Sequence, residues 1–209
     1  RLVVANGEFQ VEFRLANAIW YRDTFGPSIA PAFLSTTKTH FDAAIEGLDF
    51  ASPQAVTTIN DWVERSTNGK IETMVEEIAP EIVMYLMNAI YFKGSWREAF
   101  ERAKTANHPF AVRGGPIASS PAVPTMFGKV NVRHGRAGDL EVVELPYGGD
   151  AFVMTILLPG QGRDVNEVVS SLDVQQWTVA TTTLASPREL DVYLPKVKMS
   201  LEYGLNEPL

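Results

Sequence analysis

Side chains that could do chemistry are few in this sequence and lie far apart. The three histidines, His40, His108 and His134, share no metal-ligand spacing with one another or with carboxylates, which indicates surface or structural histidines. Glu141 and Glu144 could form a carboxylate pair, but their opposite parity on a strand directs them to different faces. There is no cysteine for thiolate or zinc chemistry. We therefore expect no catalytic residues, no metal and no cofactor.

Sequence motifs of nucleotide-binding proteins and hydrolases are also missing. Gly160-Gln161-Gly162 lacks a third glycine and follows a hairpin strand, so it indicates a solvent loop. The chain has no G-x-S-x-G elbow and no P-loop lysine motif. An enzyme is therefore the least supported class of function.

Composition narrows the possible partners. The chain has 209 residues, 45% of them hydrophobic and 21% charged, with a net charge of −7 and no basic block. This charge argues against nucleic acid and against an anionic membrane surface as partners. No apolar run reaches the ~18 residues that a membrane-spanning helix needs. The beginning of the chain lacks a signal-peptide pattern, although a mature secreted form or an internal fragment would look the same.

One apolar stretch, Ile82 to Phe92, organises the rest of the chain. It holds eleven residues without charge, Gly or Pro, and that length fits a buried strand or a short helix. Its β-branched and aromatic residues favour a long central strand. Asn88 is the only strongly polar side chain in it, and a buried amide would need hydrogen-bond partners.

The first half of the chain supplies elements that could pack on this strand. The residues at 53–68 form the best helix, with Ser52 as its cap, Pro53 in the first position and Gly69 after its end. Its apolar stripe comprises Val56, Ile59, Trp62 and Val63. The other predicted elements are a half-buried strand at Phe9–Tyr21, a weaker helix at Ser28–Phe41 and a short strand at Ala43–Leu48.

The second half reads mainly as strands. Leu140–Tyr147 and Ala151–Leu158 form the clearest hairpin, and Glu189–Leu201 is a long strand that Pro195 interrupts. Asp173 and Gln176 resemble a capping pair, but the β-branched residues at 178–184 disfavour a helix there. Further predictions are a helix at Val165–Leu172 and strands at His108–Val112 and Val123–Arg133. We predict one α+β domain with long, largely antiparallel strands.

Six blocks in order along the chain resemble the serpins, a family of serine protease inhibitors. They are Ile59–Ile71, Asn88–Trp96 (NAIYFKGSW), Val123–Met126 (VPTM), Glu144–Tyr147 (ELPY), Ile156–Pro159 (ILLP) and Leu194–Lys196 (LPK). The similarity extends from about Phe9 to Leu209. Each block alone would be weak, whereas six in the right order at similar spacing are specific.

The resemblance implies a serpin-like α+β fold of three β-sheets with surrounding helices. Phe9–Tyr21 and Ile82–Lys93 would be neighbouring strands of the large sheet, and the helix at 53–68 would cross its face. Lys196–Leu201 would lie in the same sheet beyond a missing strand, and the hairpin would belong to the second sheet. Residues 1–209 would be a single, incomplete serpin domain without the first helices, the reactive loop and the C-terminal strands.

The implied function is inhibition of a serine, or alternatively a cysteine, endopeptidase by suicide-substrate trapping, in which a reactive loop enters the large sheet. A non-inhibitory carrier or chaperone with the same fold is the alternative. The partner would be a target protease, with no nucleic acid and no membrane. The resemblance also implies a secreted monomer that is prone to polymerise.

The same comparison assigns roles to three residues. Asn88 would help to control the parting of the sheet, its amide bonding to groups outside this sequence. Trp96 and Lys196 would lie where the loop first enters, with Lys196 paired to an acidic residue on the missing strand. The reactive bond would lie outside this chain. Without its neighbour, Ile82–Phe92 would be a long apolar edge strand and a template for aggregation.

Overall fold

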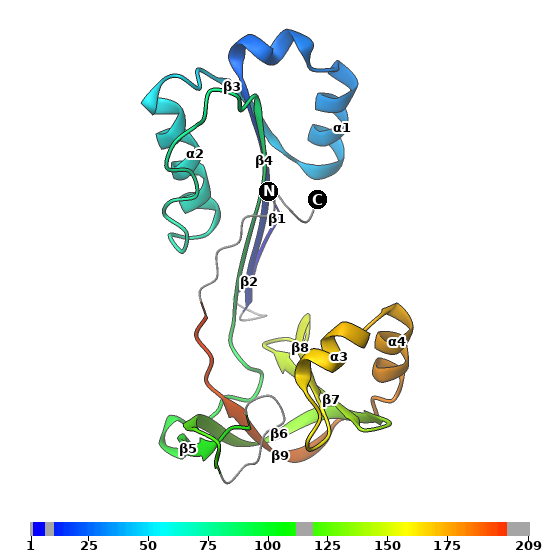
Figure 1. Cartoon of the computed structure of the whole chain (residues 1–209). Coiled ribbons are helices and arrows are strands. Elements are labelled where there is room, and N and C mark those ends of the chain that lie inside the picture. The colour runs from blue at the N-terminus through cyan, green and yellow to red at the C-terminus, as the bar shows by residue number, and fades with distance from the viewer. Residues whose placement is uncertain (1, 7–10, 112–118, 200–209) are drawn as a thin grey trace. The chain divides into compact units, whose positions relative to one another are not determined.

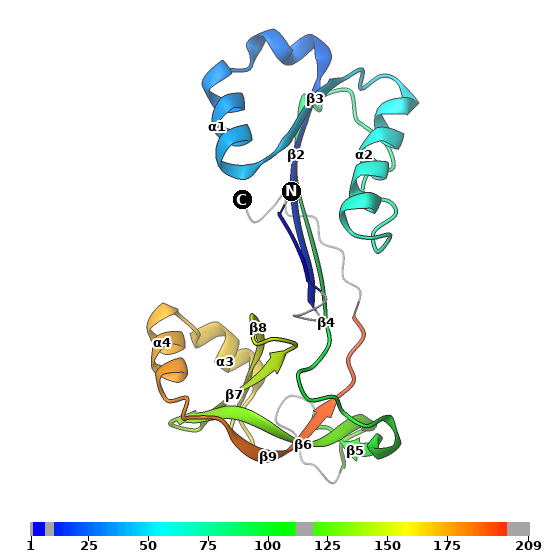
Figure 2. The ribbon, with the colours of Figure 1, turned by 180° about the vertical axis from the view of Figure 1, so that it is seen from behind.

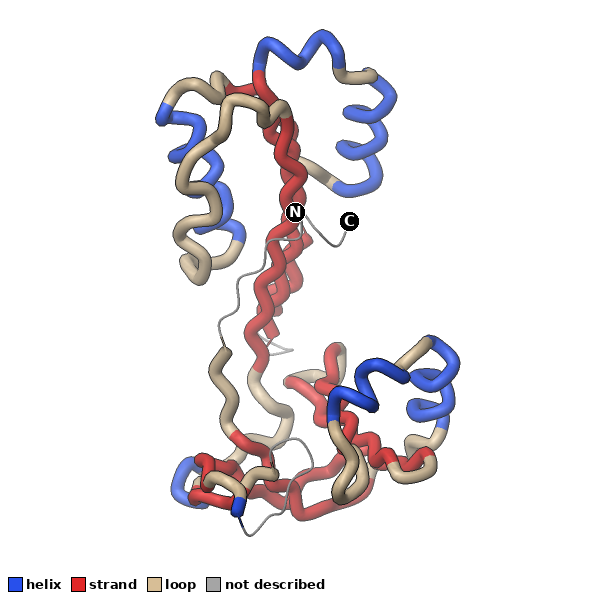
Figure 3. The backbone as a smooth tube through the Cα atoms, viewed as in Figure 1, coloured by secondary structure: helices blue, strands red, loops and turns tan. Residues whose placement is uncertain are grey.

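The computed structural model describes residues 2–6, 11–111 and 119–199 (Figure 1). These residues fall into two compact units, Arg1–Ser95 and Trp96–Leu209. Each unit has its own sheet and its own helices, as the colours of Figure 3 show. We describe the two units one after the other.

The first unit is built around β2 (Val11–Arg22), which pairs with three other strands. β4 (Met84–Gly94) runs antiparallel along one edge of β2 over nearly its whole length. β1 (Leu2–Asn6) and β3 (Ala44–Leu48) share the opposite edge, one at each end of β2. The prediction of two long neighbouring strands is therefore confirmed.

β4 begins two residues later than the sequence pattern indicates. Arg22 holds the preceding residues in a turn, because its backbone N–H donates to the Val83 carbonyl at 2.9 Å. Its guanidinium donates to the carbonyl oxygens of Ile82 at 2.9 Å and Pro80 at 2.9 Å. Ile82 packs against the core without joining the ladder. A contact between distant residues thus sets the start of the strand.

α2 (Pro53–Ser66) covers one face of the sheet, as predicted. The Ser52 hydroxyl accepts a hydrogen bond from the Gln54 N–H, and Gly69 follows the helix with φ +70°. Ile59 and Val63 are fully buried, and Ile59 packs in one cluster with Trp20 of β2. Burying side chains of this size stabilises the fold by ~1.5–3 kcal/mol each. The apolar stripe of α2 is therefore what fixes this helix on the sheet.

On the other side of the strands lies α1 (Pro31–Phe41), and α1 and α2 flank them in both views (Figures 1 and 2). A 3-10 helix, η1 (Asp23–Ser28), leads into it, and Pro31 stands in its first turn as predicted. Consecutive residues Ala18, Ile19 and Trp20 are all buried, so β2 is covered on both faces here and is not half-buried as expected. Figure 3 shows both helices beside the red strands of this unit.

The second unit has a five-stranded sheet in which β6 (Ala122–Ala137) is shared by two sets of partners. Its first part pairs with β5 (Ala106–Pro109) and β9 (Arg188–Pro195). Its last five residues pair with β7 (Leu140–Tyr147), which forms the predicted hairpin with β8 (Phe152–Leu158). Together with the sheet of the first unit, this gives three sets of paired strands. A short helix, η2 (Arg102–Lys104), precedes β5.

The helices of this unit are α3 (Val165–Ser171) and α4 (Val174–Thr182), each capped by an aspartate. The β-branched residues at 178–184 were expected to disfavour a helix. This prediction is wrong as far as Thr182, where α4 ends. Thr178 and Thr181 donate their hydroxyl protons to carbonyls one turn back, at 2.7 and 2.9 Å. Ala180 is buried against Val142, so tertiary packing outweighs the low helix propensity of threonine.

The last predicted strand, Glu189–Leu201, ends early. β9 stops at Pro195, and residues 196–199 form no strand (Figure 3). The backbone N–H of Lys196 donates to the Pro124 carbonyl at 2.8 Å. Ser200 and Leu201 lie outside the described residues, as does Val112 of the strand predicted at His108–Val112. The place of Lys196–Leu201 in the large sheet therefore stays a prediction.

Gly135 of β6 permits a close approach of the α4 end. A Cβ at this position would lie 2.3 Å from the Thr183 hydroxyl and 2.6 Å from its backbone carbonyl. We expect Gly135→Ala to lower the free energy of unfolding by ~1–3 kcal/mol, as overpacking does. Denaturant titration measures this change. Gly128→Ala on the same strand is the control, because its Cβ would meet only side chains at 3.1 Å or more, and an equal loss in both variants would contradict the explanation.

The exposed face of β4 makes a prediction about residues 1–209 produced alone. Leu86 is 68% exposed and Ile90 59% exposed, on a strand whose second edge has no strand partner among the described residues. Because such edges template pairing between copies, we expect aggregation or a molten state. Ile90→Lys should improve solubility, since a charge on an edge opposes pairing. A soluble monomer with one sharp unfolding transition would refute this expectation.

Candidate functional site

Asn88 lies in the middle of β4, directly opposite Asn17 of β2. Its Nδ2 donates to the Asn17 Oδ1 at 2.8 Å and to the Ala16 carbonyl at 3.4 Å. The Asn17 Nδ2 in turn donates to the Phe41 carbonyl, at the end of α1, at 2.8 Å. Two side-chain amides thus connect β4, β2 and α1.

This arrangement differs from the expected one, in which the Asn88 amide bonded to groups outside the sequence. The structure gives Asn88 a partner within the chain, and sequence reasoning missed Asn17. The available signal was the polar residue within the apolar pattern of β2, but pairing it with Asn88 requires the register of the two strands. A net contribution of ~0.5–1.5 kcal/mol is typical of such a hydrogen bond.

The two faces of β4 differ in what covers them. Ala89 and Tyr91 are buried on the α2 side, whereas Leu86, Ile90 and Phe92 are exposed on the Asn88 side. β2 occupies one edge of β4, and no strand pairs with the other edge in the part of the chain that the structure describes. An unpaired edge presents backbone donors and acceptors to a further strand. The described part of this edge is therefore suited to pairing with a further strand.

Tyr91 joins β4 to the end of α2. Its ring is buried, and its hydroxyl accepts a hydrogen bond from the Asn68 Nδ2 at 3.3 Å. The Arg14 guanidinium lies 5.7 Å from the ring centre and also pairs with Glu12. Cation–π contacts of this kind contribute ~0.5–1 kcal/mol at partly exposed sites. The end of α2 is thus held on the same strand that carries the open edge.

Trp96 begins the second unit and packs as a core aromatic residue. Its ring stacks on Tyr147 with centres 4.4 Å apart and meets Phe100 edge-on at 6.0 Å. A single β-bridge also links Trp96 to Tyr147. Burial raises the pKa of the Tyr147 phenol above its ordinary value. Trp96 therefore lies on the end of the β7–β8 hairpin.

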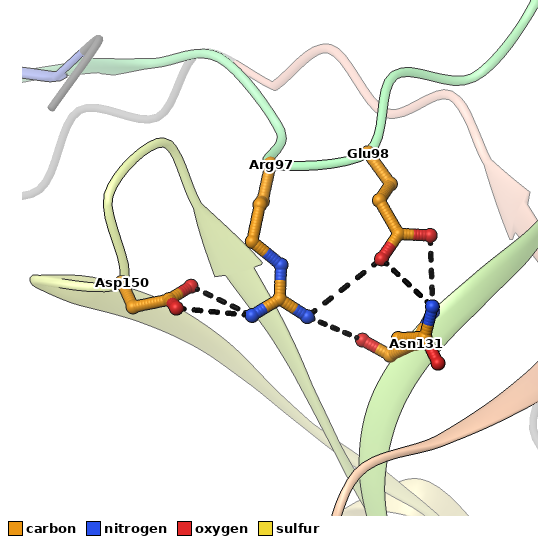
Figure 4. Close-up of polar contacts among 4 residues, drawn as sticks. All are labelled: Arg97, Glu98, Asn131 and Asp150. Atoms are coloured by element: carbon orange, nitrogen blue, oxygen red, sulfur yellow. Dashed lines mark hydrogen bonds and ion pairs between the residues drawn. The ribbon is translucent and has the colours of Figure 1, made fainter. Parts of the chain in front are cut away.

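Arg97 fixes the same segment through a polar network (Figure 4). One guanidinium nitrogen donates to both carboxylate oxygens of Asp150, at 2.9 and 3.0 Å. The other donates to the Asn131 carbonyl at 2.9 Å, and Glu98 accepts from the Asn131 backbone and side chain. The chain that follows β4 is therefore fastened to β6 and to the turn between β7 and β8.

Lys196 has an exposed side chain and follows β9 directly. Leu194 of β9 packs in the same cluster as Trp96, so the structure brings Trp96 near the end of β9. Asn88 belongs to the first unit, whereas Trp96 and Lys196 belong to the second. The roles of these three residues in sheet opening stay predictions, as does an acidic partner for Lys196.

The remaining candidates have structural partners. His134 lies between Glu141 at 3.4 Å and Arg188 at 3.2 Å, and His108 meets the Tyr193 ring edge-on. Glu144 pairs with Arg133 at 2.9 Å, so the two glutamates have separate partners. Within the described ranges, no group of three or more His, Asp or Glu side chains could hold a metal ion. No described helix is long and apolar enough to cross a membrane.

Comparisons with known proteins agree on one fold. Human Serpin I2 is 32% identical over 204 residues, which cover 94% of this chain and 49% of that protein. Iripin-2 of the tick Ixodes ricinus is 36% identical, over 93% of this chain and 49% of the relative. Emu ovalbumin matches in structure with a TM-score of 0.83 at 27% identity, covering 95% of this chain and 52% of that chain.

A thermophilic serpin, tengpin in its latent state, matches with a TM-score of 0.81 at 26% identity, over 97% of this chain and 53% of that one. The chain thus spans about half the length of the curated relatives that it matches. The serpin (serine protease inhibitor) family model matches residues 3–209. This match shows that the chain belongs to the serpin family.

Proposed function

We propose that this chain forms part of an inhibitor of a serine, or alternatively a cysteine, endopeptidase that traps its target as a suicide substrate. In this mechanism the protease cleaves an exposed loop and becomes acylated by it, and the loop then inserts as a new strand beside β4. Insertion of a serpin reactive loop into a sheet is an established form of strand addition. The observation that supports the proposal is β4 itself, a long apolar strand in a chain of the serpin family, with β2 along one edge and no strand on the other edge among the described residues.

The ladder between β2 and β4 determines where such a sheet could open. Eleven residue pairs join the two strands, from Val11–Gly94 to Tyr21–Met84. The Asn17–Asn88 hydrogen bond reinforces this ladder at its centre. Breaking so many backbone pairs together is unfavourable, so a new strand would enter on the other edge of β4. We therefore place Asn88 on the side that stays closed, where it keeps β4 in position while its outer edge exchanges partners.

Trp96 and Lys196 would act at the point of entry. Trp96 is held by Tyr147, and the Arg97 network holds the next residue, all within the second unit. The exposed Lys196 could pair with a carboxylate on the incoming or neighbouring strand. The inhibitor would contribute no catalytic residue, because the acyl transfer is done by the target protease. We also propose that residues 1–209 are part of a longer single domain that is secreted as a monomer.

A covalent complex is the direct test of inhibition. The complete protein should form a complex with a trypsin-, chymotrypsin- or papain-like protease that survives denaturing electrophoresis. Cleavage in the loop should also raise the unfolding temperature, because the sheet gains a strand. Cleavage without a complex, and without a gain in stability, would refute trapping by loop insertion.

The second candidate is a non-inhibitory carrier or chaperone. Thyroxine-binding globulin, solved with a thyroxine derivative, shares the fold with a TM-score of 0.80 at 23% identity. A shared fold does not determine function, so the same scaffold can serve another purpose. Cleavage of the loop that leaves the unfolding temperature unchanged would favour this candidate.

The asparagine pair gives a prediction for the complete protein. We expect Asn88→Ala and Asn17→Ala each to lower the unfolding temperature and to promote polymerisation on heating. In a double-mutant cycle the two changes should couple by ~0.5–1.5 kcal/mol, since each removes the same hydrogen bond. Asn107→Ala, on an exposed position of β5, serves as the control. Strictly additive effects, or a monomer of unchanged stability after heating, would count against the assigned role.

A further inference from the structure

The end of α2 carries an Asn-Gly dipeptide in an unusual backbone geometry. Asn68 has φ +55° and Gly69 has φ +70°, so two consecutive residues adopt the left-handed conformation after the helix. Glycine adopts it freely, and asparagine tolerates it better than most residues. The Gly69 N–H donates to the Glu64 carbonyl at 2.8 Å and thereby closes the last turn of α2. This hydrogen bond is the C-terminal cap of the helix.

An Asn-Gly dipeptide can also react with itself. The backbone nitrogen of the glycine attacks the side-chain Cγ of the asparagine, a C–N bond forms and ammonia leaves, which gives a five-membered succinimide. One water molecule then opens the ring to aspartate or isoaspartate. Glycine favours the attack because it has no Cβ to obstruct it. The reaction consumes water, releases ammonia and needs no other reagent.

In this structure the attacking nitrogen is already engaged. The Gly69 nitrogen must lose its proton to attack, but that proton is held by the Glu64 carbonyl in the cap. The left-handed backbone of both residues must also change for the ring to close. Reaction therefore requires the last turn of α2 to open, and its rate should follow the fraction of molecules in which it is open.

We propose that Asn68 is a deamidation site that the C-terminal cap of α2 protects, and that its conversion loosens α2 from β4. Asn68 is exposed to solvent, so water can reach the site as soon as the turn opens. Its Nδ2 is the donor to the buried Tyr91 hydroxyl at 3.3 Å. Conversion to aspartate or isoaspartate replaces this donor by a carboxylate oxygen, so the present hydrogen bond is lost and the link persists only where the Tyr91 hydroxyl turns to donate.

The electrostatic surroundings of residue 68 also disfavour the new carboxylate. It lies after the C-terminus of a helix, where the macrodipole disfavours negative charge. Asp61 and Glu64 line the same hollow as Asn68, together with Arg65 and Gly69. The product is therefore less well accommodated than the amide, with two carboxylates and one guanidinium nearby. Both effects act in the same direction and weaken the end of α2.

Peptide mapping of the complete protein tests whether the C-terminal cap of α2 protects Asn68 from deamidation. A synthetic peptide of residues 64–72, incubated beside the protein at mildly alkaline pH, gives the rate of the unprotected sequence. We expect Asn68 to convert at least about tenfold more slowly in the folded protein, and urea below the unfolding transition should raise the rate toward that of the peptide. Asn60 is the internal control, because its amide is bonded to Val75 and it precedes Asp61. Conversion of Asn68 as fast as in the peptide, or none in protein unfolded by urea, would overturn the proposal.

A matched pair of variants tests the consequence. Asn68→Asp reproduces the charge of the product, whereas Asn68→Gln keeps an amide that closes a ring far less readily. Hydrogen exchange of the α2 backbone amides should be faster in Asn68→Asp than in Asn68→Gln or in the parent protein. Equal exchange in all three would refute the loosening of α2. Because neither measurement depends on inhibition of a target protease, the result is independent of whether the protein is an inhibitor.

Discussion

The pairing of β2 with β4 is the constraint on which the rest of the first unit depends. Both strands place apolar side chains on both faces, so neither face can remain in water without cost. α2 covers one face with Ile59 against Trp20, and the end of α1 is tied to the other through Asn17. β1 and β3 fill the second edge of β2. Among the described residues no strand pairs with the outer edge of β4, and Leu86 and Ile90 on its face are exposed.

This incomplete covering gives the proposed function a physical basis. In the proposed mechanism β4 keeps its ladder with β2, while a new strand joins its other edge, where no described strand pairs. The new backbone hydrogen bonds and the burial of exposed apolar side chains would both favour the expanded sheet. The same property makes the edge a hazard, because a strand from another molecule could bind there equally well. In the proposed mechanism, inhibition and polymerisation would thus be two outcomes of one exposed surface.

Much of the fold could be predicted because local and long-range preferences agree. The helix over β2 and β4 has a capping serine, a proline in its first position and an apolar stripe, and the β7–β8 hairpin has alternating strands around a glycine turn. Prediction failed where a distant contact decides the local structure. Arg22 delays the start of β4, and packing of Ala180 keeps a threonine-rich segment helical.

The candidate site was harder to predict than the fold, because its residues come from different elements. Asn88 was recognisable as one polar position in an apolar run. Its partner Asn17 lies 71 positions away in sequence, and the two meet only because of the register between β2 and β4. The Arg97 network likewise joins a loop to Asn131 and Asp150, which no local pattern connects. The resemblance suggested Asn88 and Trp96 as candidates, and the structure shows the partners of each within its own unit.

The Asn17–Asn88 pair also favours one register of β4 along β2, although its hydrogen bond contributes little to the free energy of unfolding. Shifting β4 by one residue along β2 would turn its whole set of side chains to the opposite face. It would also separate the two amides and place each beside an apolar neighbour, where an unpaired amide costs ~1–3 kcal/mol if buried. Leucines at 17 and 88 could bury more apolar area, but they would pair equally well in several registers. In the proposed mechanism β4 exchanges partners on one edge and needs a fixed register on the other, and the Asn17–Asn88 hydrogen bond favours the observed register.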